Sequence, residues 1–390
     1  MILLFLLACV YLKGSPGQYN GARVPDSFGI NCAGNDLDLG PTPQIASDGY
    51  KWVRTSIAWG DLEDSNGVYH WPIFDQRLAE LARNGIRPLI MIIGNRRHAP
   101  VNVPKSDEDI AGFVNFARRC AARYREYHPI WELWNEPDYR LFWPPKRDSA
   151  EYIRLALATA KGLKADDPGV QIAAPAVGAL DLPYLQDVAN SGLLSYIDEF
   201  SIHLYHQWQP EGFLDEFARV RALLPSVGHR VGIIDSESGY PRTWTGITEE
   251  REAEYLCRSY LLGIVQGADI TFLFEWNDHS VAGTVMTWGN LGINSNGQPT
   301  AARKALQNLI RRLNGYSLVS NHINRDESVY VLKFSNGIDT RLVGWTALGD
   351  PKNEQDWNRN PAGDPNASVD VQYGSRTLHL TGMPQVWDLK

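Results

Sequence analysis

The chain has 390 residues, of which 44% are hydrophobic and 21% are charged, so it has an ordinary globular composition with ample material for a core. Its 37 Lys and Arg against 45 Asp and Glu give a formal net charge of −8, which argues against nucleic acid or an anionic membrane as a partner. The length suits one large barrel, or one large domain followed by a smaller one.

The N-terminal segment, Met1 to Leu12, is an apolar run. It is shorter than the ~20 residues that a membrane-spanning helix needs, so we expect no stable membrane span. It fits the apolar region of a secretory signal, although no Lys or Arg precedes it. Leu6 to Cys9 also resembles a bacterial lipoprotein cleavage site. We therefore expect a signal-like segment over residues 1–20 and a secreted or periplasmic protein, with a lipoprotein anchor or a nonfunctional apolar tail as alternatives.

From residue 21 to residue 314, short apolar segments alternate with amphipathic ones. The apolar segments have strand lengths and predict a parallel sheet that is covered on both faces. The eight expected strands are Phe28–Ala33, Trp52–Trp59, Pro88–Gly94, Ile130–Asn135, Gln171–Val177, Phe200–Tyr205, Val231–Asp235 and Ile270–Trp276. Eight strand–helix units in this length predict a (β/α)8 TIM barrel. The rival, an open doubly wound sheet, is disfavoured by the count and by the lack of a glycine-rich phosphate loop after the first strand.

Helices are expected between these strands, and polar residues mark several of their starts. Ser106, Ser149 and Thr248 each precede apolar residues at helical spacing and are candidate N-caps. Asn84 and Gly85 end an earlier helix, and a last helix covers roughly residues 300–313.

The pattern changes after Gly315, where short alternating segments predict a small β-domain over residues 315–390. A loop rich in Asp, Asn, Pro and Gly interrupts it between residues 349 and 366. The expected strands of this domain are Ser328–Phe334, Thr340–Trp345, Val369–Tyr373, Thr377–Leu380 and Val386–Leu389.

The cysteines show no Cys-x-x-Cys spacing, so no zinc or redox motif is visible, and no cofactor is expected. They are Cys9, Cys32, Cys120 and Cys257. Cys120 and Cys257 lie on apolar helical stripes and are expected to be buried thiols. A metal-dependent hydrolase would need a cluster such as His-x-His. The nearest approach is His203 with His206, and this spacing favours no metal.

Two glutamates follow apolar strands. Glu136 ends the fourth expected strand in Trp134-Asn135-Glu136-Pro137, and Glu237 follows the seventh. TIM barrels carry their active sites at the carboxyl ends of the strands, so both side chains are expected in one cleft. Glycosidic-bond cleavage needs such a pair, because one carboxyl group protonates the leaving group while the other stabilises or captures the cationic sugar.

Further polar and aromatic residues lie in or just after the expected strands. They are Arg54, Trp59, His98, His203, Tyr205 and Trp276. Glu132, inside the fourth strand, is expected to be a buried hydrogen-bonded carboxylate that supports the barrel, and Asp235 is likewise expected to be structural.

Trp134-Asn135-Glu136-Pro137 resembles the acid/base motif of the clan A glycoside hydrolases, and the segment Asp235 to Gly239 resembles their nucleophile strand. In the second motif Ser236 stands where Thr is commoner. Tyr69-His70-Trp71 and the segment from Gly297 to Leu306 are also typical of the clan. The resemblance covers most of residues 25–313. Within the clan the sequence most resembles glycoside hydrolase family 39 and its bacterial exopolysaccharide-cleaving relatives, which also carry a small C-terminal β-domain.

The resemblance implies a retaining reaction, in which Glu136 is the general acid and then the general base, and Glu237 is the nucleophile. Arg54 and Tyr205 would keep the nucleophile ionised, since a nearby cation or hydrogen bond lowers a carboxyl pKa. Asn135 would bind the sugar 2-hydroxyl. The remaining candidates are His203, which would order the end of strand six, Trp276, which would form an apolar platform under the sugar, and the weaker candidates His98 and Trp59.

Alternatives remain at this level. A transglycosylase would share every one of these residues. The alternative outside the enzymes is a barrel that binds carbohydrate without catalysis. An open groove lined by Trp143, Trp208 and Trp244 would favour attack within a polysaccharide, and a blocked pocket would favour attack at its end.

Overall fold

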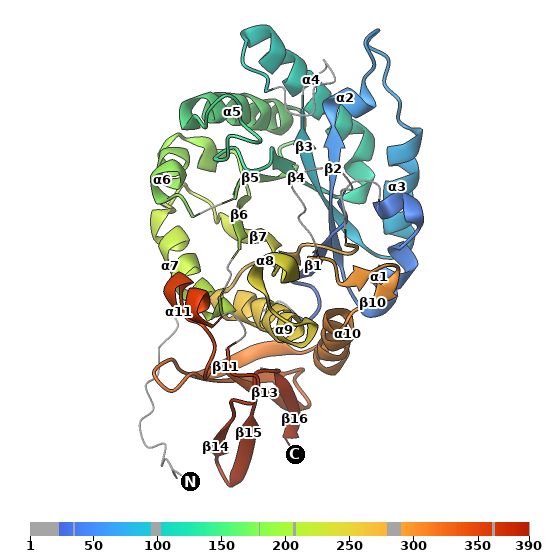
Figure 1. Ribbon diagram of the computed structural model, residues 1–390. Helices are drawn as coiled ribbons and strands as arrows, with labels where there is room; N and C mark the ends of the chain where they lie inside the picture. Colours follow the sequence, from blue (N-terminus) through green and yellow to red (C-terminus); the bar gives the residue numbers. More distant parts are fainter. Residues whose placement is uncertain are drawn as a thin grey trace.

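The structure is a computed structural model that describes residues 23–33, 36–94, 103–178, 180–205, 208–278, 290–360 and 363–389. In these ranges eight parallel strands, β1 to β8 in chain order, close into a barrel. Their bounds are β1 Phe28–Asn31, β2 Trp52–Ala58, β3 Arg87–Ile93, β4 Ile130–Leu133, β5 Gln171–Val177, β6 Glu199–Leu204, β7 Gly232–Ser238 and β8 Ile270–Leu273. The (β/α)8 fold predicted from the alternating pattern is confirmed (Figure 1).

Helices surround the barrel (Figure 1). The longer ones are α1 Thr42–Asp48, α3 Pro72–Arg83, α4 Asp107–Tyr124, α5 Ser149–Asp166, α6 Leu182–Asn190, α7 Phe213–Leu223, α9 Glu249–Gln266 and α10 Ala301–Leu313. Single turns are α2 Trp59–Leu62, α8 Arg242–Thr245 and the 3-10 turns Asp36–Leu39, Arg125–Tyr127, Leu193–Ser195 and Pro210–Gly212. Ser106, Thr248 and Thr300 accept hydrogen bonds as N-caps. The N-cap of α5 is Asp148 rather than the expected Ser149, because the Asp148 carboxylate accepts from the Glu151 N–H.

The barrel interior has an apolar layer near the amino ends of the strands and a charged layer nearer their carboxyl ends. Trp52 and Ile130, the first residues of β2 and β4, belong to an apolar cluster. Side chains two positions apart on a strand point to the same face, so Arg54 and Glu132 follow Trp52 and Ile130 on the inside. The apolar layer therefore supports a charged layer nearer the carboxyl ends of the strands.

The C-terminal region forms an antiparallel sheet in the order β11-β12-β13-β16 and a separate hairpin, β14-β15. Its strands are β11 Ser317–Asn324, β12 Val329–Ser335, β13 Thr340–Thr346, β14 Val369–Tyr373, β15 Arg376–Leu380 and β16 Gln385–Leu389. The short pair β9 Asn294–Ser295 and β10 Gln298–Pro299 precedes α10. β11 was not among the expected strands. The domain boundary that we expect between residues 314 and 315 falls in the connection from α10 to β11.

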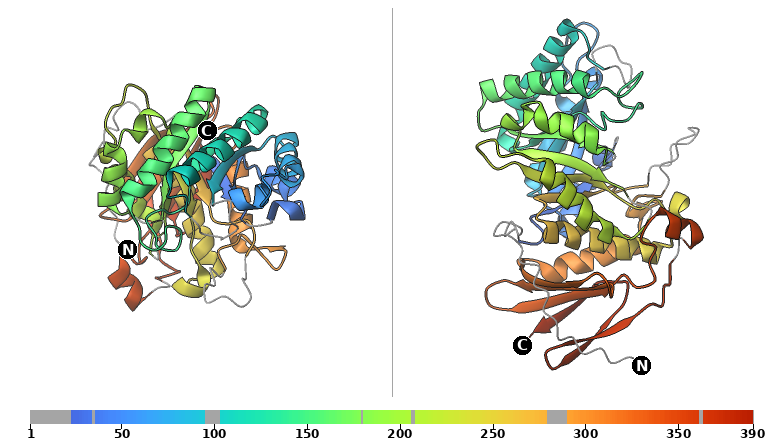
Figure 2. Two further views of the ribbon diagram at one scale, coloured as in Figure 1. Left: turned by 90° about the horizontal axis from the view of Figure 1, so that it is seen from above. Right: turned by 90° about the vertical axis from the view of Figure 1, so that its left-hand side faces the viewer.

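A segment of this C-terminal region returns to the barrel. It contains α11 Glu354–Arg359, which lies beside α8 (Figure 2, right). The Trp357 Nε1 donates to the Thr245 carbonyl at 3.2 Å, and the Pro351 carbonyl accepts from the Gln209 N–H at 3.0 Å. The polar loop that interrupts the β-domain in sequence is therefore attached to the loops that follow β6 and β7.

A buried ion-pair cluster fixes the start of that segment. Asp350, 6% exposed, accepts from Arg251 at 2.7 Å and from Arg258 at 2.6 Å. Both arginines lie on α9. Trp345 of β13 donates to Glu211 at 2.7 Å, which adds a second polar contact between the sheet and the barrel.

Two further expectations concern the N-terminus and the thiols. The segment Met1–Leu12 lies outside the described residues, and no described helix has the length and apolar character needed to cross a membrane. Cys120 and Cys257 are buried as free thiols, as expected, and so is Cys32.

Candidate active site

Glu136 is presented by a sharp turn at the end of β4. Trp134 and Glu136 have φ values of 80° and 42°, in the left-handed region that few non-glycine residues adopt. The turn is held because the Glu136 N–H donates to the Ala176 carbonyl at 2.8 Å and the buried Trp134 ring packs edge-on against Trp143. Strained backbone of this kind persists where the surroundings over-determine it. The carboxyl group of Glu136 is thereby turned into the mouth of the barrel, with the residue 7% exposed.

Glu237 lies near the end of β7, opposite His203 of β6 in the strand register. It is also 7% exposed. Arg54 donates to its Oε1 atom, and the Tyr205 hydroxyl donates to its Oε2 atom at 2.8 Å. Each carboxylate oxygen therefore has one donor, which fixes the plane of the group.

His203 joins the two glutamates. Its Nδ1 atom lies 2.9 Å from Glu136 Oε1 and 3.6 Å from Glu237 Oε2. One carboxylate oxygen of Glu136 and one of Glu237 lie within 4.8 Å of each other and of the imidazole. Residues about a hundred positions apart in sequence thus form one compact acidic site around a buried histidine.

Arg54 of β2 organises the charged layer beneath this site. It donates to Glu132 at 2.6 Å, to the Asn31 side-chain oxygen at 3.0 Å and to the Asn135 side-chain oxygen at 3.0 Å, in addition to Glu237. Glu132 is fully buried, which confirms the expectation of a hydrogen-bonded carboxylate inside the barrel. Because Arg54 occupies the Asn135 oxygen, the amide NH2 of Asn135 is the group left to meet a ligand.

The charges of the site set its protonation. Burial alone would raise the pKa of Glu237, but the charges of His203 and Arg54 and the hydrogen bonds from Tyr205 and Arg54 outweigh it, so this pKa is lowered. Burial alone would lower the pKa of His203, but the two glutamates raise it. The site therefore favours an ionised Glu237 beside a charged imidazole.

Asp235 stands apart from this polar group. It is 1% exposed, and burial raises its pKa well above the ordinary range. A buried carboxyl group in the barrel wall, outside this polar group, fits the structural role expected for it.

Three tryptophans assigned to the site or its groove are buried elsewhere. Trp59, 4% exposed, stacks on Phe116 of α4 and donates to Glu63 at 2.6 Å, so it belongs to the packing between the barrel and its helices. Trp143 is fully buried against Trp134 and cannot line a groove.

The third, Trp276, is 2% exposed, and the Arg303 guanidinium lies 4.4 Å from its ring centroid. A ring with so little exposed surface offers almost no face to a sugar. Phe274, two residues earlier and just after β8, is partly exposed and was missed. Phe274 and Trp276 are both aromatic residues just after β8 and cannot be distinguished by sequence pattern. They differ in the structure because Trp276 packs on α10. His98 and the Trp244 side chain lie outside the described residues, and Trp208 is partly exposed in the loop after β6.

The geometry of Glu136, His203 and Glu237 is also compatible with a metal ion. The donors are two carboxylates and one imidazole, which many divalent metals accept. However, Glu237 already receives the Arg54 cation, and a second positive charge at the same carboxylate would be repelled by it. The donor set as held here therefore fits an acid–base pair better than a metal centre.

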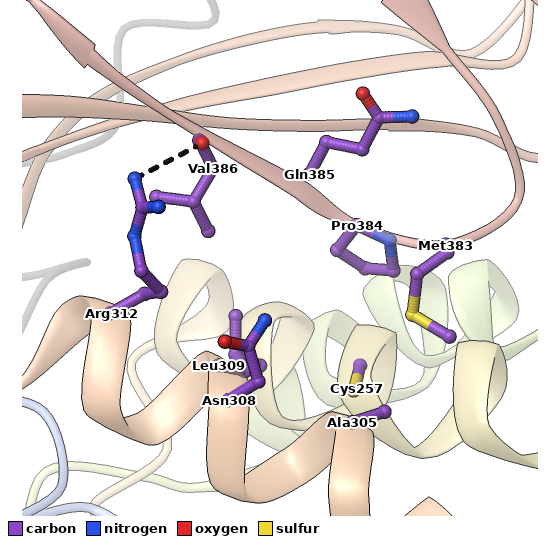
Figure 3. A pocket seen from close by; sticks show the side chains of 9 residues that line it. All are labelled: Cys257, Ala305, Asn308, Leu309, Arg312, Met383, Pro384, Gln385 and Val386. Carbon is purple, nitrogen blue, oxygen red and sulfur yellow. Dashed lines mark hydrogen bonds between the residues drawn. The ribbon is translucent and has the colours of Figure 1, made fainter. Parts of the chain in front are cut away.

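A cavity lined by residues outside this site lies between the barrel helices and the C-terminal sheet (Figure 3). It measures about 350 Å³ and lies between α9, α10 and the start of β16. Cys257, Leu309, Met383 and Val386 give it an apolar lining, and Arg312 bonds the Val386 carbonyl at its edge. None of its lining residues belongs to the polar site.

No protein-family model matches this sequence, and no curated protein matches it in sequence. The fold, by contrast, is similar to solved structures of glycoside hydrolases of families 39 and 30, both of clan A.

One similar structure is a family 39 glycoside hydrolase from the gut symbiont Bacteroides cellulosilyticus WH2, with a TM-score of 0.73 and 20% identity over 94% of this chain and 81% of that one. A monomeric beta-xylosidase from Caulobacter crescentus CB15 has a TM-score of 0.66 and 17% identity over 91% and 80% of the two chains. A GH30 endoxylanase from Clostridium papyrosolvens C71 has a TM-score of 0.58 and 12% identity over 96% and 95%. At these identities the similarity shows a shared architecture, and the chemistry has to be argued from the site.

Proposed function

We propose that this protein is a retaining glycoside hydrolase that cleaves O-glycosidic bonds in an oligosaccharide or polysaccharide through a glycosyl-enzyme intermediate. The observation that carries the proposal is the close approach of the carboxylates: one oxygen of Glu136 and one of Glu237 lie within 4.8 Å, and both groups lie beside the same nitrogen of His203. Retaining enzymes hold their two carboxyl groups about 5–5.5 Å apart, whereas inverting enzymes leave about 6.5–9.5 Å for a water molecule.

In the first step, Glu237 attacks the anomeric carbon while Glu136 gives its proton to the glycosidic oxygen. The C–O bond to the leaving sugar breaks, and an ester bond forms between Glu237 and the retained sugar. In the second step, Glu136 takes a proton from water, whose oxygen attacks the anomeric carbon and releases Glu237. The two inversions restore the original configuration, and Glu136 is protonated again.

The neighbours of the carboxylates suit these two roles. Arg54 and Tyr205 hold Glu237 ionised and aimed, which a nucleophile requires. The imidazole of His203, 2.9 Å from Glu136, can donate from Nδ1 to the carboxylate that remains after proton transfer. His203 therefore positions the acid/base and stabilises its ionised form.

Sugar binding falls to Asn135 and Phe274. The free amide NH2 of Asn135 can donate to a 2-hydroxyl, a contact that strengthens in the transition state. The partly exposed ring of Phe274, at the end of β8, replaces Trp276 as the apolar platform.

The solved structures of similar fold support the class, because those named above are glycoside hydrolases. Secretion, which the first twelve residues suggest, would bring such an enzyme to polysaccharides outside the cell. A transglycosylase uses the same two carboxylates, and the acceptor alone separates it from a hydrolase. A non-catalytic sugar-binding barrel would not need two ionisable groups at this spacing.

The test is the stereochemistry of turnover. The purified protein is incubated with a panel of aryl glycosides, and proton NMR follows the first anomer formed from the sugar it accepts. Retention supports the proposal, inversion or the absence of any turnover refutes it, and an added acceptor sugar reveals transfer.

A further inference from the structure

One exposed aromatic side chain lies beside Glu136 and has no part in the site as described. Tyr139 follows Glu136 by three residues in the loop after β4 and is 44% exposed. Large aromatic rings contribute binding energy mainly through buried area, so an exposed ring next to a carboxyl group of the site has area that a ligand can cover.

Gly178, just after β5, shows how close the ring and the carboxyl group are. A Cβ atom at this position would stand 2.6 Å from the Tyr139 Cδ2 atom and also 2.6 Å from the carboxyl carbon of Glu136, so at most 5.2 Å separates those two atoms. Any side chain at residue 178 would occupy the space between the ring and the acid. Glycine at this position therefore allows the ring and the carboxyl group to stand this close to the same stretch of backbone.

The arrangement is fixed rather than accidental. The Gly178 N–H donates to the Asp138 carboxylate at 2.9 Å, and the Tyr139 hydroxyl donates to the Gly178 carbonyl at 3.4 Å. Both contacts tie the loop after β4 to the end of β5. Burial, and after it the charges of Glu136 and Asp138, raises the pKa of Tyr139, which agrees with its place beside the carboxyl groups.

The side of Glu136 on which Tyr139 lies identifies the sugar it meets. The nucleophile Glu237 and its partner Arg54 bind from β7 and β2, and Asn135 joins them, so the sugar that becomes attached to Glu237 lies on that side. Tyr139 lies against Glu136 and Gly178, and none of its described contacts is with Glu237, Arg54 or Asn135. A glycosidic oxygen at Glu136 has the retained sugar toward Glu237 and the departing sugar on the other side.

We infer that the Tyr139 ring forms the subsite for the departing sugar, stacking on the residue whose oxygen Glu136 protonates. The inference deepens the proposed function and rests on it. It restricts the preferred substrates to glycosides whose departing group is large enough to cover the ring, and a second linked sugar is the departing group proposed here.

The test compares two substrates with the same retained sugar, chosen as the one that wild type prefers among aryl glycosides. A disaccharide fills both subsites, whereas the glycosyl fluoride lacks a departing sugar. Tyr139→Ala should lower kcat/KM for the disaccharide about tenfold or more and leave the fluoride within about twofold of wild type. Tyr139→Phe keeps the ring and should leave both substrates close to wild type.

Three outcomes would overturn the inference. Equal losses on both substrates would mean that Tyr139 acts by positioning Glu136, which serves as base in the turnover of the fluoride as well. An unchanged disaccharide rate would mean that the ring makes no useful contact. If wild type turns over neither the fluoride nor any aryl glycoside, the proposed function itself fails and the subsite falls with it.

Discussion

The Tyr205 hydroxyl lies 2.8 Å from the Oε2 atom of Glu237 and donates to it from the end of the neighbouring strand. Arg54 holds the other oxygen of the same carboxylate. Burial works to raise the pKa of Glu237, so these donors and the charge of His203 are what keep it low. The ionised state of Glu237, the proposed nucleophile, therefore depends on a few named contacts, and each can be removed separately.

Replacing Tyr205 by Phe should raise the pKa of Glu237 and move the acid limb of the kcat/KM profile to higher pH. A hydrogen bond to a charged group is worth about 1.5–3 kcal/mol, so kcat/KM should fall about 10- to 100-fold. The measurement is a pH series with an activated aryl glycoside. Tyr152→Phe, which removes another buried hydroxyl that donates to the Leu133 carbonyl at 3.0 Å, is the matched control and should leave the limb in place. An unmoved limb in the Tyr205 variant would contradict the role given to the hydroxyl.

His203→Gln should change the pH dependence of stability. The pKa of His203 is raised in the folded protein, so its protonated form stabilises the fold below the ordinary value of 6.5, and this contribution is lost as pH rises through the folded pKa. The difference in unfolding free energy between wild type and variant should therefore shrink from pH 6 to pH 9. Urea titrations at each pH measure it. A difference that stays constant over that range would show that His203 is not charged in the folded protein.

Arg54→Met should reduce both stability and activity, because it leaves Glu132 buried without a cation. Breaking a buried pair in this way costs about 3–5 kcal/mol. Adding Glu132→Gln removes the stranded charge, so the double variant should recover most of the unfolding free energy while activity stays low, since Glu237 still lacks its donor. Denaturant unfolding and aryl glycoside kinetics on the same samples separate the two effects. Recovery of activity in the double variant would show that Arg54 serves the fold alone.

Asp350→Ala should destabilise the protein by about 3–5 kcal/mol, since Arg251 and Arg258 would lose the carboxylate that pairs both in a buried cluster. Asp388→Asn is the control. Its side chain is 61% exposed and pairs with Arg341 at the surface, where an ion pair is worth about 1 kcal/mol or less. Thermal and urea unfolding measure both variants. Equal small effects would show that the cluster between α9 and the α11 segment adds nothing to stability.

Much of the fold was predictable because the two periodic patterns are local properties of the chain. Apolar runs of strand length alternating with amphipathic helices predicted the barrel, and the ends of those runs placed Glu136 and Glu237 at the same face. β11 escaped prediction because its burial pattern is mixed along most of its length, so the alternation that marks a half-buried strand is weak. The contact of Trp357 with Thr245 depends on residues more than a hundred positions apart, and no local pattern contains it.

The aromatic residues were the least predictable part of the site. Tryptophan is a residue type expected on sugar-binding surfaces. The rings of Trp59, Trp143 and Trp276 nevertheless pack against helices or other rings. Tyr139 and Phe274 are aromatic as well, but Tyr139 is exposed and Phe274 is partly exposed. The direction of a ring depends on the backbone dihedrals and on the helix that packs behind it. Neither can be read from the few residues at the end of a strand. The sequence contained one signal for Tyr139: it follows Glu136 by three residues, and a glycine, Gly178, stands at the end of the next strand, β5.

The central claim is that Glu237 forms a covalent bond to the sugar and Glu136 transfers the proton. Azide rescue of the two alanine variants, with an activated aryl glycoside as substrate, tests it most directly. Glu237→Ala should regain turnover in azide and yield a glycosyl azide of inverted configuration, because azide replaces the nucleophile. Glu136→Ala should yield a glycosyl azide of retained configuration, because azide attacks the ester on Glu237. The same configuration from both variants, or full activity in either without azide, would contradict the account.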